Sequence, residues 1–433
     1  MAEPASLDSI WSPASPALAR VAVVSLHTSP TASLGHSANG GLNVYVREVC
    51  AAFSRRGVAT DVFTRRLSEA GPDVEQLAPG SRVVYLPAGS PGLDRYALLD
   101  HVPGFTREVD RFLTGSGLRY DLIYSHYWLS GLCACWLRGR LELPWVHTAH
   151  TLAVVKNRSL APEDRPEPEI RADLEGEIAR CADLLVVSTA TEGDVLRRAY
   201  AVRPDRLAAV PPGVDLVLFR PRPKPLSRLL VGVPEGRLFV FVGRLERLKG
   251  VDLILRALAL LTADGRHPDA RLLVLGEDGG GGVGEKARLQ ALARELGVGD
   301  RVDFVGSVPQ SRLAPYYSAA EAVLMPSYSE SFGLAGLEAQ ACGTAVVASR
   351  ATGLASIVRD GVNGFVVGSA DPVAYAERMR RLLEEPGLAE AMGRRGRRLA
   401  ERYSWQRTAD DLLQRFQALA APQLGVQATA RQE

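Results

Sequence analysis

The sequence predicts an α/β protein made of two doubly wound, Rossmann-like domains, each with a parallel sheet covered by helices on both faces. A chain of 433 residues is too long for one ordinary hydrophobic core. Short apolar runs alternate with segments of helical periodicity, which is typical of parallel strands joined by helices. The alternation stops once, in the proline-rich run 211–225, and then restarts. We therefore expect a first domain over 20–212 and a second over 213–405.

The first domain begins with a buried strand, a polar loop and an amphipathic helix. The helix follows Gly40 and Gly41 and places Val46 and Phe53 on one face, while Arg47 faces water. Polar clusters follow the apolar runs, and the carboxyl ends of parallel strands are the usual place for a ligand. The expected strands are 20–27, 60–65, 122–125, 145–148 and 184–188.

The second domain repeats this organisation. An apolar helical run over 251–261 follows its first strand. We expect disordered tails at 1–19 and beyond Pro422. The expected strands are 238–242, 272–275, 302–305, 322–325 and 345–348.

Composition excludes several classes of function. Lysine and arginine number 51 against 49 acidic residues, so a net charge of +2 does not indicate nucleic-acid binding or a membrane-binding surface. No apolar stretch is long enough to span a bilayer. The five cysteines lack the paired spacing of a zinc site or a disulfide framework, and we expect a cytoplasmic protein without a bound catalytic metal.

Two cations mark an anion-binding site in the second domain. Gly243 and Arg244 end a predicted strand, and Lys249 precedes the following helix. A helix start attracts anions, an arginine can grip a pyrophosphate with a fork of donors, and a lysine adds a compact charge. Such a pair can also neutralise the charge that develops on a departing diphosphate.

Two carboxylates lie near a second helix start in the same domain. Glu330 precedes Ser331-Phe332-Gly333-Leu334, and Glu338 follows within the helix. The free backbone N–H groups of this helix start can meet phosphate oxygens. Glu330 can accept hydrogen bonds from sugar hydroxyls, and Glu338 from a ribose.

The Gly-Arg-x4-Lys and Glu-x7-Glu patterns resemble those of the retaining glycosyltransferases of the GT-B fold, over roughly 20–405. The resemblance implies two Rossmann-like domains with the active site in the cleft between them. It also implies that 406–433 contains a closing helix, which crosses back onto the first domain before the disordered tail. It implies a UDP-sugar co-substrate held by Gly41, Arg244, Lys249, Glu330 and Glu338, and it assigns Glu330 and His150 to catalysis.

Three first-domain motifs narrow the resemblance. They are Gly-Gly-Leu-Asn-Val-Tyr-Val at 40–46, Ser-His-Tyr-Trp-Leu-Ser-Gly at 125–131, and His-Thr-Ala-His-Thr-Leu-Ala-Val-Val-Lys-Asn at 147–157. They are similar to those of the inositol-phosphate N-acetylglucosaminyltransferases of the mycothiol pathway. This similarity implies UDP-N-acetylglucosamine as donor and a phosphorylated cyclitol, such as 1D-myo-inositol 3-phosphate, as acceptor. The implied acceptor-binding residues are His27, Asn43, Arg95, Tyr127, Thr151 and Arg171.

Two positions depart from that pattern. Ala38 stands where the family has an aspartate, and Val308 where it has an arginine near the donor.

His150 matches a histidine that faces the donor sugar; its side chain ordinarily titrates near pH 6.5, and we assign it positioning and electrostatic roles. No carboxylate of the first-domain motifs is an obvious nucleophile, which suits a mechanism in which the departing diphosphate helps to deprotonate the acceptor hydroxyl.

Two other functions remain open at this point. One is a transferase similar to sucrose-phosphate synthase, although that group usually has glutamine after the glycine pair, where this chain has Leu42 and Asn43. The other is a non-catalytic UDP-sugar-binding protein. A structural divalent cation near Thr344 and a homodimer also stay open. The partners we expect are small-molecule substrates, without nucleic acid or membrane insertion.

Overall fold

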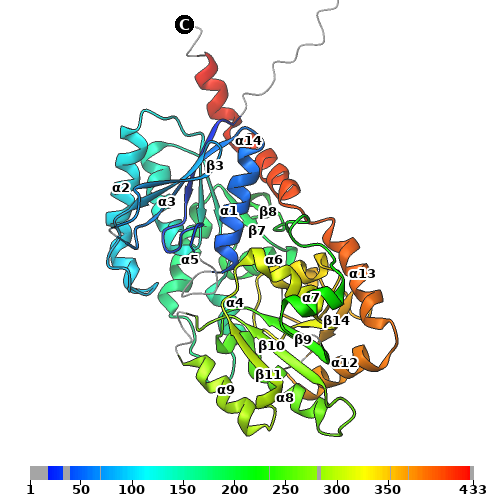
Figure 1. The fold of residues 1–433 in the computed structure, drawn as a ribbon. Coiled ribbons are helices and arrows are strands. Elements are labelled where there is room, and N and C mark those ends of the chain that lie inside the picture. Colours follow the sequence, from blue (N-terminus) through cyan, green and yellow to red (C-terminus); the bar gives the residue numbers. More distant parts are fainter. Residues whose placement is uncertain are drawn as a thin grey trace, which may run out of the picture.

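The structure is a computed structural model, and it describes residues 18–32, 40–68, 70–233, 235–279, 284–351, 353–368 and 370–429. Two α/β domains lie one above the other in Figure 1, each with its own sheet. This arrangement confirms the fold class that the sequence predicts.

The first sheet has the order β3-β4-β2-β1-β5-β6-β7-β8 in the described residues. Its neighbouring strands are parallel except for the antiparallel pair β3 and β4. The strands are β1 Arg20–Val24, β2 Ala59–Arg65, β3 Val74–Ala78, β4 Ser81–Leu86, β5 Leu122–His126, β6 Trp145–Thr148, β7 Leu184–Val187 and β8 Leu207–Ala209.

The second sheet is parallel throughout its described strands and has the order β11-β10-β9-β12-β13-β14. The order reverses beside β9, so the carboxyl ends of β9 and β12 meet at a switch point where ligands bind in open sheets. The strands are β9 Arg237–Val242, β10 Ala270–Leu275, β11 Val302–Gly306, β12 Ala322–Met325, β13 Ala345–Ser349 and β14 Gly364–Val367.

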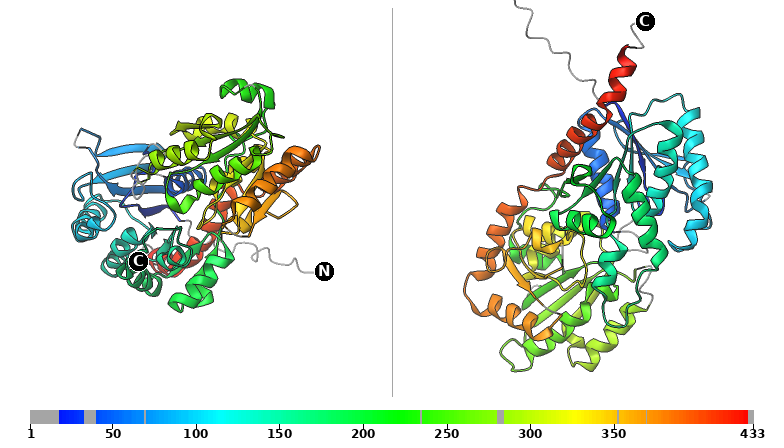
Figure 2. Two further views of the ribbon diagram at one scale, coloured as in Figure 1. Left: turned by 90° about the horizontal axis from the view of Figure 1, so that it is seen from below. Right: turned by 180° about the vertical axis from the view of Figure 1, so that it is seen from behind.

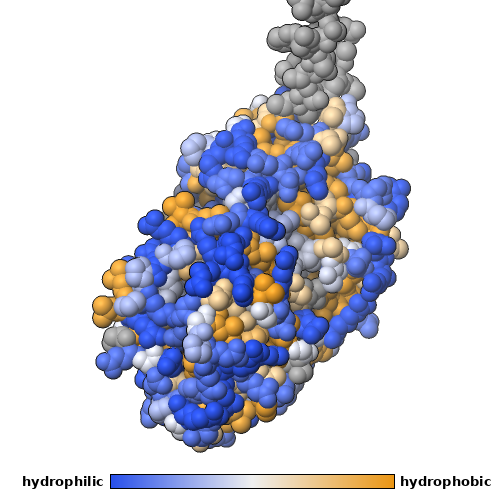
Figure 3. All heavy atoms as spheres, turned by 90° about the vertical axis from the view of Figure 1, so that its right-hand side faces the viewer, coloured by the Kyte–Doolittle hydropathy of each residue, from blue (hydrophilic) through white to orange (hydrophobic). Residues whose placement is uncertain are grey.

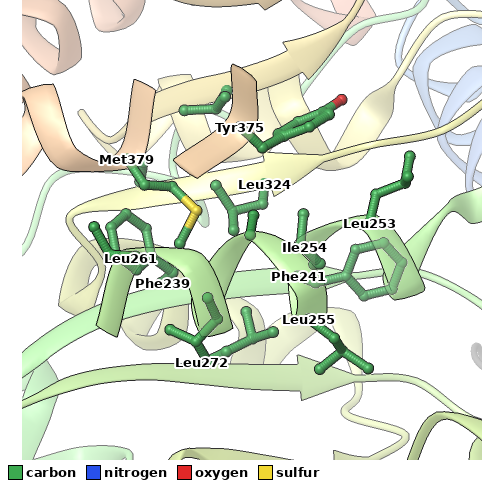
Figure 4. Packing of buried hydrophobic residues seen from close by; sticks show 14 of the residues in the cluster. Phe239, Phe241, Leu253, Ile254, Leu255, Leu261, Leu272, Leu324, Tyr375 and Met379 are labelled. Atoms are coloured by element: carbon green, nitrogen blue, oxygen red, sulfur yellow. The ribbon is translucent and has the colours of Figure 1, made fainter. Parts of the chain in front are cut away.

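Helices cover both sheets and bury their apolar faces against them. In α8, Ile254, Leu258 and Leu261 are fully buried and pack with Phe239 on β9, as the close view of this core shows for the residues that it labels (Figure 4). The helices are α1 Gly41–Ser54, α2 Val102–Gly115, α3 Trp128–Leu141, α4 Ala153–Arg158, α5 Glu169–Cys181, α6 Ala190–Tyr200, α7 Lys224–Leu230, α8 Val251–Thr262, α9 Glu285–Glu295, α10 Leu313–Ala319, α11 Leu334–Ala341, α12 Pro372–Glu384, α13 Leu388–Ala400 and α14 Trp405–Thr429.

The linker between the domains differs in part from the prediction. Residues up to Pro223 lack regular structure, but α7 follows immediately, with Pro225 in its first turn. Proline is tolerated there because its missing N–H is not needed in the first turn of a helix. Gly213 lies against the start of α14, and a Cβ atom at this position would stand 2.2 Å from the backbone nitrogen of Trp405.

The last helix returns to the first domain, as the red α14 beside the blue α1 shows in Figure 1. The rings of Phe53 and Phe416 stack edge to face with centroids 5.8 Å apart. The view from behind shows α13 and α14 running along one side of both domains (Figure 2). The helix continues past Pro422 to Thr429, where the sequence predicts disorder.

The predicted N-terminal tail lies mostly outside the described residues, which start at Leu18. Leu18 itself is 3% exposed and belongs to the core around α1 and α14, whereas the sequence predicts that it lies in a disordered tail. The backbone nitrogens of Ala19 and Arg20 donate to the carboxylate of Asp121, which fixes the start of β1.

Hydrophilic residues cover most of the face drawn in Figure 3, with small hydrophobic patches scattered among them. Within the described part of the chain, no helix combines the length and the apolar character that crossing a membrane requires.

Candidate active site

A cavity of about 340 Å³ lies between the two domains, and both contribute to its walls. The first domain supplies residues from the carboxyl ends of its strands and from the start of α1. The second supplies the loops after β9 and β12 and the start of α11. The predicted site residues that line this cavity are His27, Gly41, Arg95, Tyr127, His150, Thr151, Arg244, Lys249 and Glu330.

On the second-domain wall, each predicted phosphate-binding cation contacts a carboxylate. Lys249 Nζ lies 2.7 Å from Glu330 Oε2, and Arg244 Nη1 lies 2.9 Å from Glu246 Oε1. Although burial opposes the ionisation of Glu246, the charges of Arg244 and Lys249 lower its pKa below the ordinary value. Each of the two cations is thus oriented by a carboxylate.

Backbone conformation brings the Lys249 loop close to the Glu330 loop. Gly250 begins α8 with φ of +65°, a conformation that favours glycine. A Cβ atom there would lie 2.4 Å from the carbonyl oxygen of Pro326, just after β12. Only a residue without a side chain allows the two loops to approach so closely.

Glu338 lies in α11 but does not line the cavity. Its Oε1 accepts a hydrogen bond of 2.7 Å from Gln310 Nε2, and its Oε2 accepts one of 2.7 Å from the hydroxyl of Tyr317. Burial raises the pKa of Glu338 to about 7, and these hydrogen bonds oppose the rise only in part. Ribose binding by this carboxylate stays a prediction.

On the first-domain wall, Arg95, Tyr127 and Thr151 line the cavity as predicted for an acceptor phosphate, whereas Arg171 lies behind them. The Arg171 side chain is fully buried, with Nη2 donating to Thr151 Oγ1 at 2.9 Å. Its guanidinium carbon stands 5.0 Å from the centre of the Tyr127 ring. In this structure Arg171 therefore supports the wall from behind, and direct contact with an acceptor stays a prediction.

His27 and Asn43 differ in their suitability for binding an acceptor. His27 lines the cavity, and its Nδ1 has no hydrogen-bond partner among the described residues. The Asn43 amide instead binds protein: its oxygen accepts from the Gly40 nitrogen at 3.0 Å, and its Nδ2 donates to Thr28 Oγ1 at 2.5 Å. Asn43 thus holds the loop after β1 against the start of α1.

His150 occupies a strained position after β6, with φ of +59° in the left-handed region. Its Nε2 lies 3.0 Å from Nδ1 of His126, and the Tyr45 ring packs edge-on against it with centroids 5.1 Å apart. Burial lowers the pKa of His150 to about 3, so its ring is neutral near pH 7. The ordinary histidine pKa near 6.5 does not apply at this position, because packing against His126 and Tyr45 shields the ring from water in a way that the sequence does not reveal.

Several direct contacts join the two walls. The Ser331 hydroxyl donates to the carbonyl oxygen of His150, which fixes the strained loop against the start of α11. Arg247 forms an ion pair of 2.6 Å with Glu163. At Gly41, a Cβ atom would approach Leu334 Cδ1 to 3.3 Å, so this glycine permits close contact between the helix starts. These contacts bring donor-side and acceptor-side residues together.

Sequence reasoning missed four charged residues of this region. Lys156, Glu192 and Glu246 line the cavity, and Glu167 lies behind the first-domain wall. Lys156 belongs to the third sequence motif, so its place beside Thr151 offered a usable signal. Glu192 lies in the first turn of α6, where its backbone nitrogen donates to Oγ1 of the capping residue Thr189 at 3.1 Å. A place in the first turn of a helix does not predict a place in a cavity.

Replacing Glu192 with glutamine is expected to stabilise the protein at pH 8 but not at pH 5. Burial raises the pKa of Glu192 from 4.5 to about 7. The folded state therefore binds a proton more tightly than the unfolded state, and stability falls as the pH rises through this window. Glutamine cannot ionise, so we expect its free energy of unfolding to exceed that of the wild type by about 2 kcal/mol at pH 8.

Urea denaturation at both pH values measures this difference. Asp194→Asn is the control, because Asp194 lies in the same helix with its side chain 46% exposed. An equal effect of Glu192→Gln at pH 5 and pH 8 would contradict the assigned titration.

The remaining predicted features fall partly outside the described residues. Ala38 lies in the segment 33–39, outside the described residues. Val308 packs against the core of the second domain. The Thr344 hydroxyl donates to the carbonyl oxygen of Tyr317 at 2.7 Å. Within the described ranges, no group of three or more His, Cys, Asp or Glu side chains could hold a metal ion.

Two family models match the chain, one on each domain. The model described as "Glycosyl transferases group 1" matches residues 232–399, and that described as "Glycosyl transferase 4-like domain" matches 40–213. The fold and the two-walled site thus define a nucleotide-sugar-dependent glycosyltransferase. The chain belongs to the GT-B glycosyltransferase family, as the resemblance of its motifs predicts.

Curated relatives and solved structures support the same assignment. The D-inositol 3-phosphate glycosyltransferase of Segniliparus rotundus is 43% identical over 418 residues, which cover 96% of this chain and 92% of that protein. The Corynebacterium jeikeium protein of the same name is 43% identical over 407 residues, covering 92% and 97%. Sucrose-phosphate synthase from Thermosynechococcus elongatus superimposes with a TM-score of 0.87 at 34% identity, covering 93% of this chain and 100% of that one.

A more distant solved structure shares the fold alone. Anabaena HepE in complex with UDP and glucose gives a TM-score of 0.74 at 19% identity, covering 92% of this chain and 100% of that one.

Proposed function

We propose that the chain transfers N-acetylglucosamine from UDP-N-acetylglucosamine to a phosphorylated cyclitol such as 1D-myo-inositol 3-phosphate, with retention of the anomeric configuration. The observation that carries the proposal is the pairing of two cationic walls across one cavity. Arg244 and Lys249 stand on one wall, and Arg95 and Lys156 on the other. A diphosphate donor and a phosphorylated acceptor each require such a wall.

The names of the curated relatives support the acceptor. Each of the two relatives described above is a D-inositol 3-phosphate glycosyltransferase, and each is matched over more than nine-tenths of its length. The acceptor wall of this chain offers Tyr127 and Thr151 hydroxyls in addition to its cations. These donors suit a phosphate group and the hydroxyls of a ring that carries it.

The chemical steps follow from the placement of charge. Arg244 and Lys249 would stabilise the diphosphate as the bond to the sugar breaks. The departing diphosphate would accept the proton of the incoming hydroxyl on the same face of the sugar, which gives retention. His150, neutral and held by His126, would orient the donor sugar without taking a proton.

A donor and acceptor panel tests the proposal. UDP release is measured with UDP-N-acetylglucosamine or UDP-glucose, each with inositol 3-phosphate, unphosphorylated inositol or fructose 6-phosphate. We expect turnover with UDP-N-acetylglucosamine and inositol 3-phosphate, a product of matching mass, and an NMR coupling that shows the retained anomer. Absence of transfer with every pair would reject the proposal, and an inverted product would reject retention.

Synthesis of a hexose phosphate disaccharide is the second candidate. The sucrose-phosphate synthase structure favours it through its identity of 34% and its coverage. Turnover with UDP-glucose and fructose 6-phosphate in the same panel would support it. UDP binding without any turnover would instead support a non-catalytic protein.

Replacing Arg95 with alanine is expected to raise the KM for the phosphorylated acceptor about 10- to 100-fold, with little change in kcat or donor KM. Arg95 lines the cavity, and its side chain is 39% exposed, so it can meet a phosphate directly. One hydrogen bond to a charged group contributes about this much to affinity. Initial rates at varied acceptor concentration measure the change.

Arg95→Lys is the matched control, because it keeps the charge but loses the planar fork, and it should give an intermediate acceptor KM. An acceptor KM equal to that of the wild type in the alanine variant would remove Arg95 from the phosphate site.

A further inference from the structure

A carboxylate occupies the point where the acceptor-side cations converge. Glu167 Oε1 lies 2.8 Å from Lys156 Nζ and 3.1 Å from Arg95 Nη2, while Oε2 lies 2.8 Å from Arg171 Nη1. The Tyr96 hydroxyl also donates to Oε2. Burial opposes ionisation, but the charges of these cations lower the pKa of Glu167 to about 2. The group is therefore a permanent anion in the acceptor subsite.

The backbone around Glu167 is fixed in place. Its nitrogen donates to Asn157 Oδ1 at 2.7 Å, and its carbonyl oxygen accepts from Asn157 Nδ2 at 3.0 Å. Pro166 and Pro168 flank the residue, and each proline ring restricts the backbone. The carboxylate thus does not depend on a flexible loop to reach the cations.

The cavity and Glu167 lie on different sides of the same cations. Arg95 and Lys156 line the cavity, whereas Glu167 does not and is 8% exposed. A phosphate that enters the cavity meets these two side chains from the front while Glu167 contacts them from behind. The two anions therefore share the same donors, Nη2 of Arg95 and Nζ of Lys156.

We propose that Glu167 limits the phosphate affinity of the acceptor subsite, as an internal anion that competes with the acceptor phosphate for Arg95 and Lys156. This inference rests on the proposed function, which places a phosphate on that wall. Glu167 offsets the mutual repulsion of the three clustered cations Arg95, Lys156 and Arg171. When phosphate binds, the carboxylate repels it and still occupies N–H donors of Arg95 and Lys156. The site therefore binds phosphate less tightly than these cations would without Glu167.

The consequence for turnover is a limit on product affinity. The product of the proposed reaction keeps the phosphate of the acceptor, so the same wall holds substrate and product. A wall without Glu167 would bind both more tightly, and stronger product binding slows release.

The test compares wild type with Glu167→Gln, which keeps the size of the side chain and removes its charge. Inorganic phosphate is the probe, because it needs no sugar transfer, and its binding is measured by calorimetry. We expect phosphate to bind about tenfold more tightly to the variant. We also expect a steeper rise of Tm with phosphate concentration and a lower KM for the phosphorylated acceptor. The Tm of the variant without phosphate serves as the check on folding of the first domain, and UDP affinity shows whether the donor wall in the other domain is unchanged.

The control is Glu169→Gln, which removes an exposed carboxylate two residues away and should leave phosphate affinity unchanged. Equal or weaker phosphate binding by Glu167→Gln, with UDP affinity intact, overturns the inference, as does a lack of phosphate binding in both proteins. If the variant unfolds without phosphate, recovery of UDP binding on adding phosphate supports the inference, and failure to recover overturns it.

The two proposals fail separately in these measurements. Tighter phosphate binding without transfer to any phosphorylated cyclitol leaves the role of Glu167 standing and rejects the proposed acceptor. Transfer to inositol 3-phosphate by the wild type, without any gain in phosphate affinity in Glu167→Gln, supports the proposed acceptor and rejects the role of Glu167.

Discussion

Glu330→Gln is expected to lower kcat about 10²- to 10³-fold while UDP affinity stays close to that of the wild type. Glu330 lines the cavity and accepts a contact of 2.7 Å from Lys249. As a carboxylate it can accept strong hydrogen bonds from donor-sugar hydroxyls, and loss of one such charged contact in the transition state has an effect of this size. The nucleotide lacks the sugar, so its binding does not depend on that contact.

Steady-state kinetics and UDP titration calorimetry measure the two quantities separately. Glu377→Gln, which removes an exposed carboxylate from α12 of the same domain, is the control for a general change of charge. A variant with the wild-type rate would exclude a catalytic role for Glu330. Parallel loss of rate and UDP affinity would show instead that Glu330 acts mainly by holding Lys249.

Arg171→Ala is expected to destabilise the first domain by about 3–5 kcal/mol. Arg171 is fully buried, and its guanidinium contacts Glu167 and Glu175 at 2.8 Å each. Without the arginine, the buried Glu175 loses the cation that compensates its charge, whereas Glu167 keeps its contacts with Lys156 and Arg95. Removal of one partner of a buried ion pair has a cost of this size. The sequence alone predicts only weaker acceptor binding for this variant, because it does not show that the side chain is buried.

Urea denaturation of the variant measures the loss, and a double-mutant cycle assigns its cause. Adding Glu175→Gln to Arg171→Ala removes one unpaired charge and should recover part of the stability. Arg171→Lys keeps the charge but not the fork, so an intermediate value is expected. Wild-type stability in Arg171→Ala, together with a raised acceptor KM, would contradict this account and favour direct contact with the acceptor.

Most strands that the sequence predicts are buried on both faces of the two sheets, and the edge strand β11 is the exception. Runs such as β6 and β12 consist mainly of apolar residues, and the structure gives both with the predicted bounds. The strands that escaped prediction, β3, β4, β8 and β14, lie at or next to the sheet edges. β3 is antiparallel to β4 and largely exposed, so its residues lack the continuous apolar run of a buried strand.

Charge partners were harder to predict than the charges themselves. The positions of Arg244, Lys249 and Arg95 on one cavity follow from strand ends and motif matches. Their carboxylate partners lie elsewhere in the chain, as Glu330 does from Lys249, and spacing along the sequence does not reveal such pairs. The sequence also does not show which side chains are shielded from water. For that reason neither the neutral ring of His150 nor the buried guanidinium of Arg171 could be predicted from it.

Gly213 determines how the cavity can open. The chain passes between the domains twice, once at Gly213 and once before Trp405, and these two passages touch, with the Val214 nitrogen donating to the Tyr403 carbonyl oxygen at 3.1 Å. Because the two interdomain crossings contact each other at one point, this point acts as a hinge. The two domains can rotate about it but cannot separate. Opening must therefore break contacts such as the Arg247–Glu163 ion pair while this crossing remains intact.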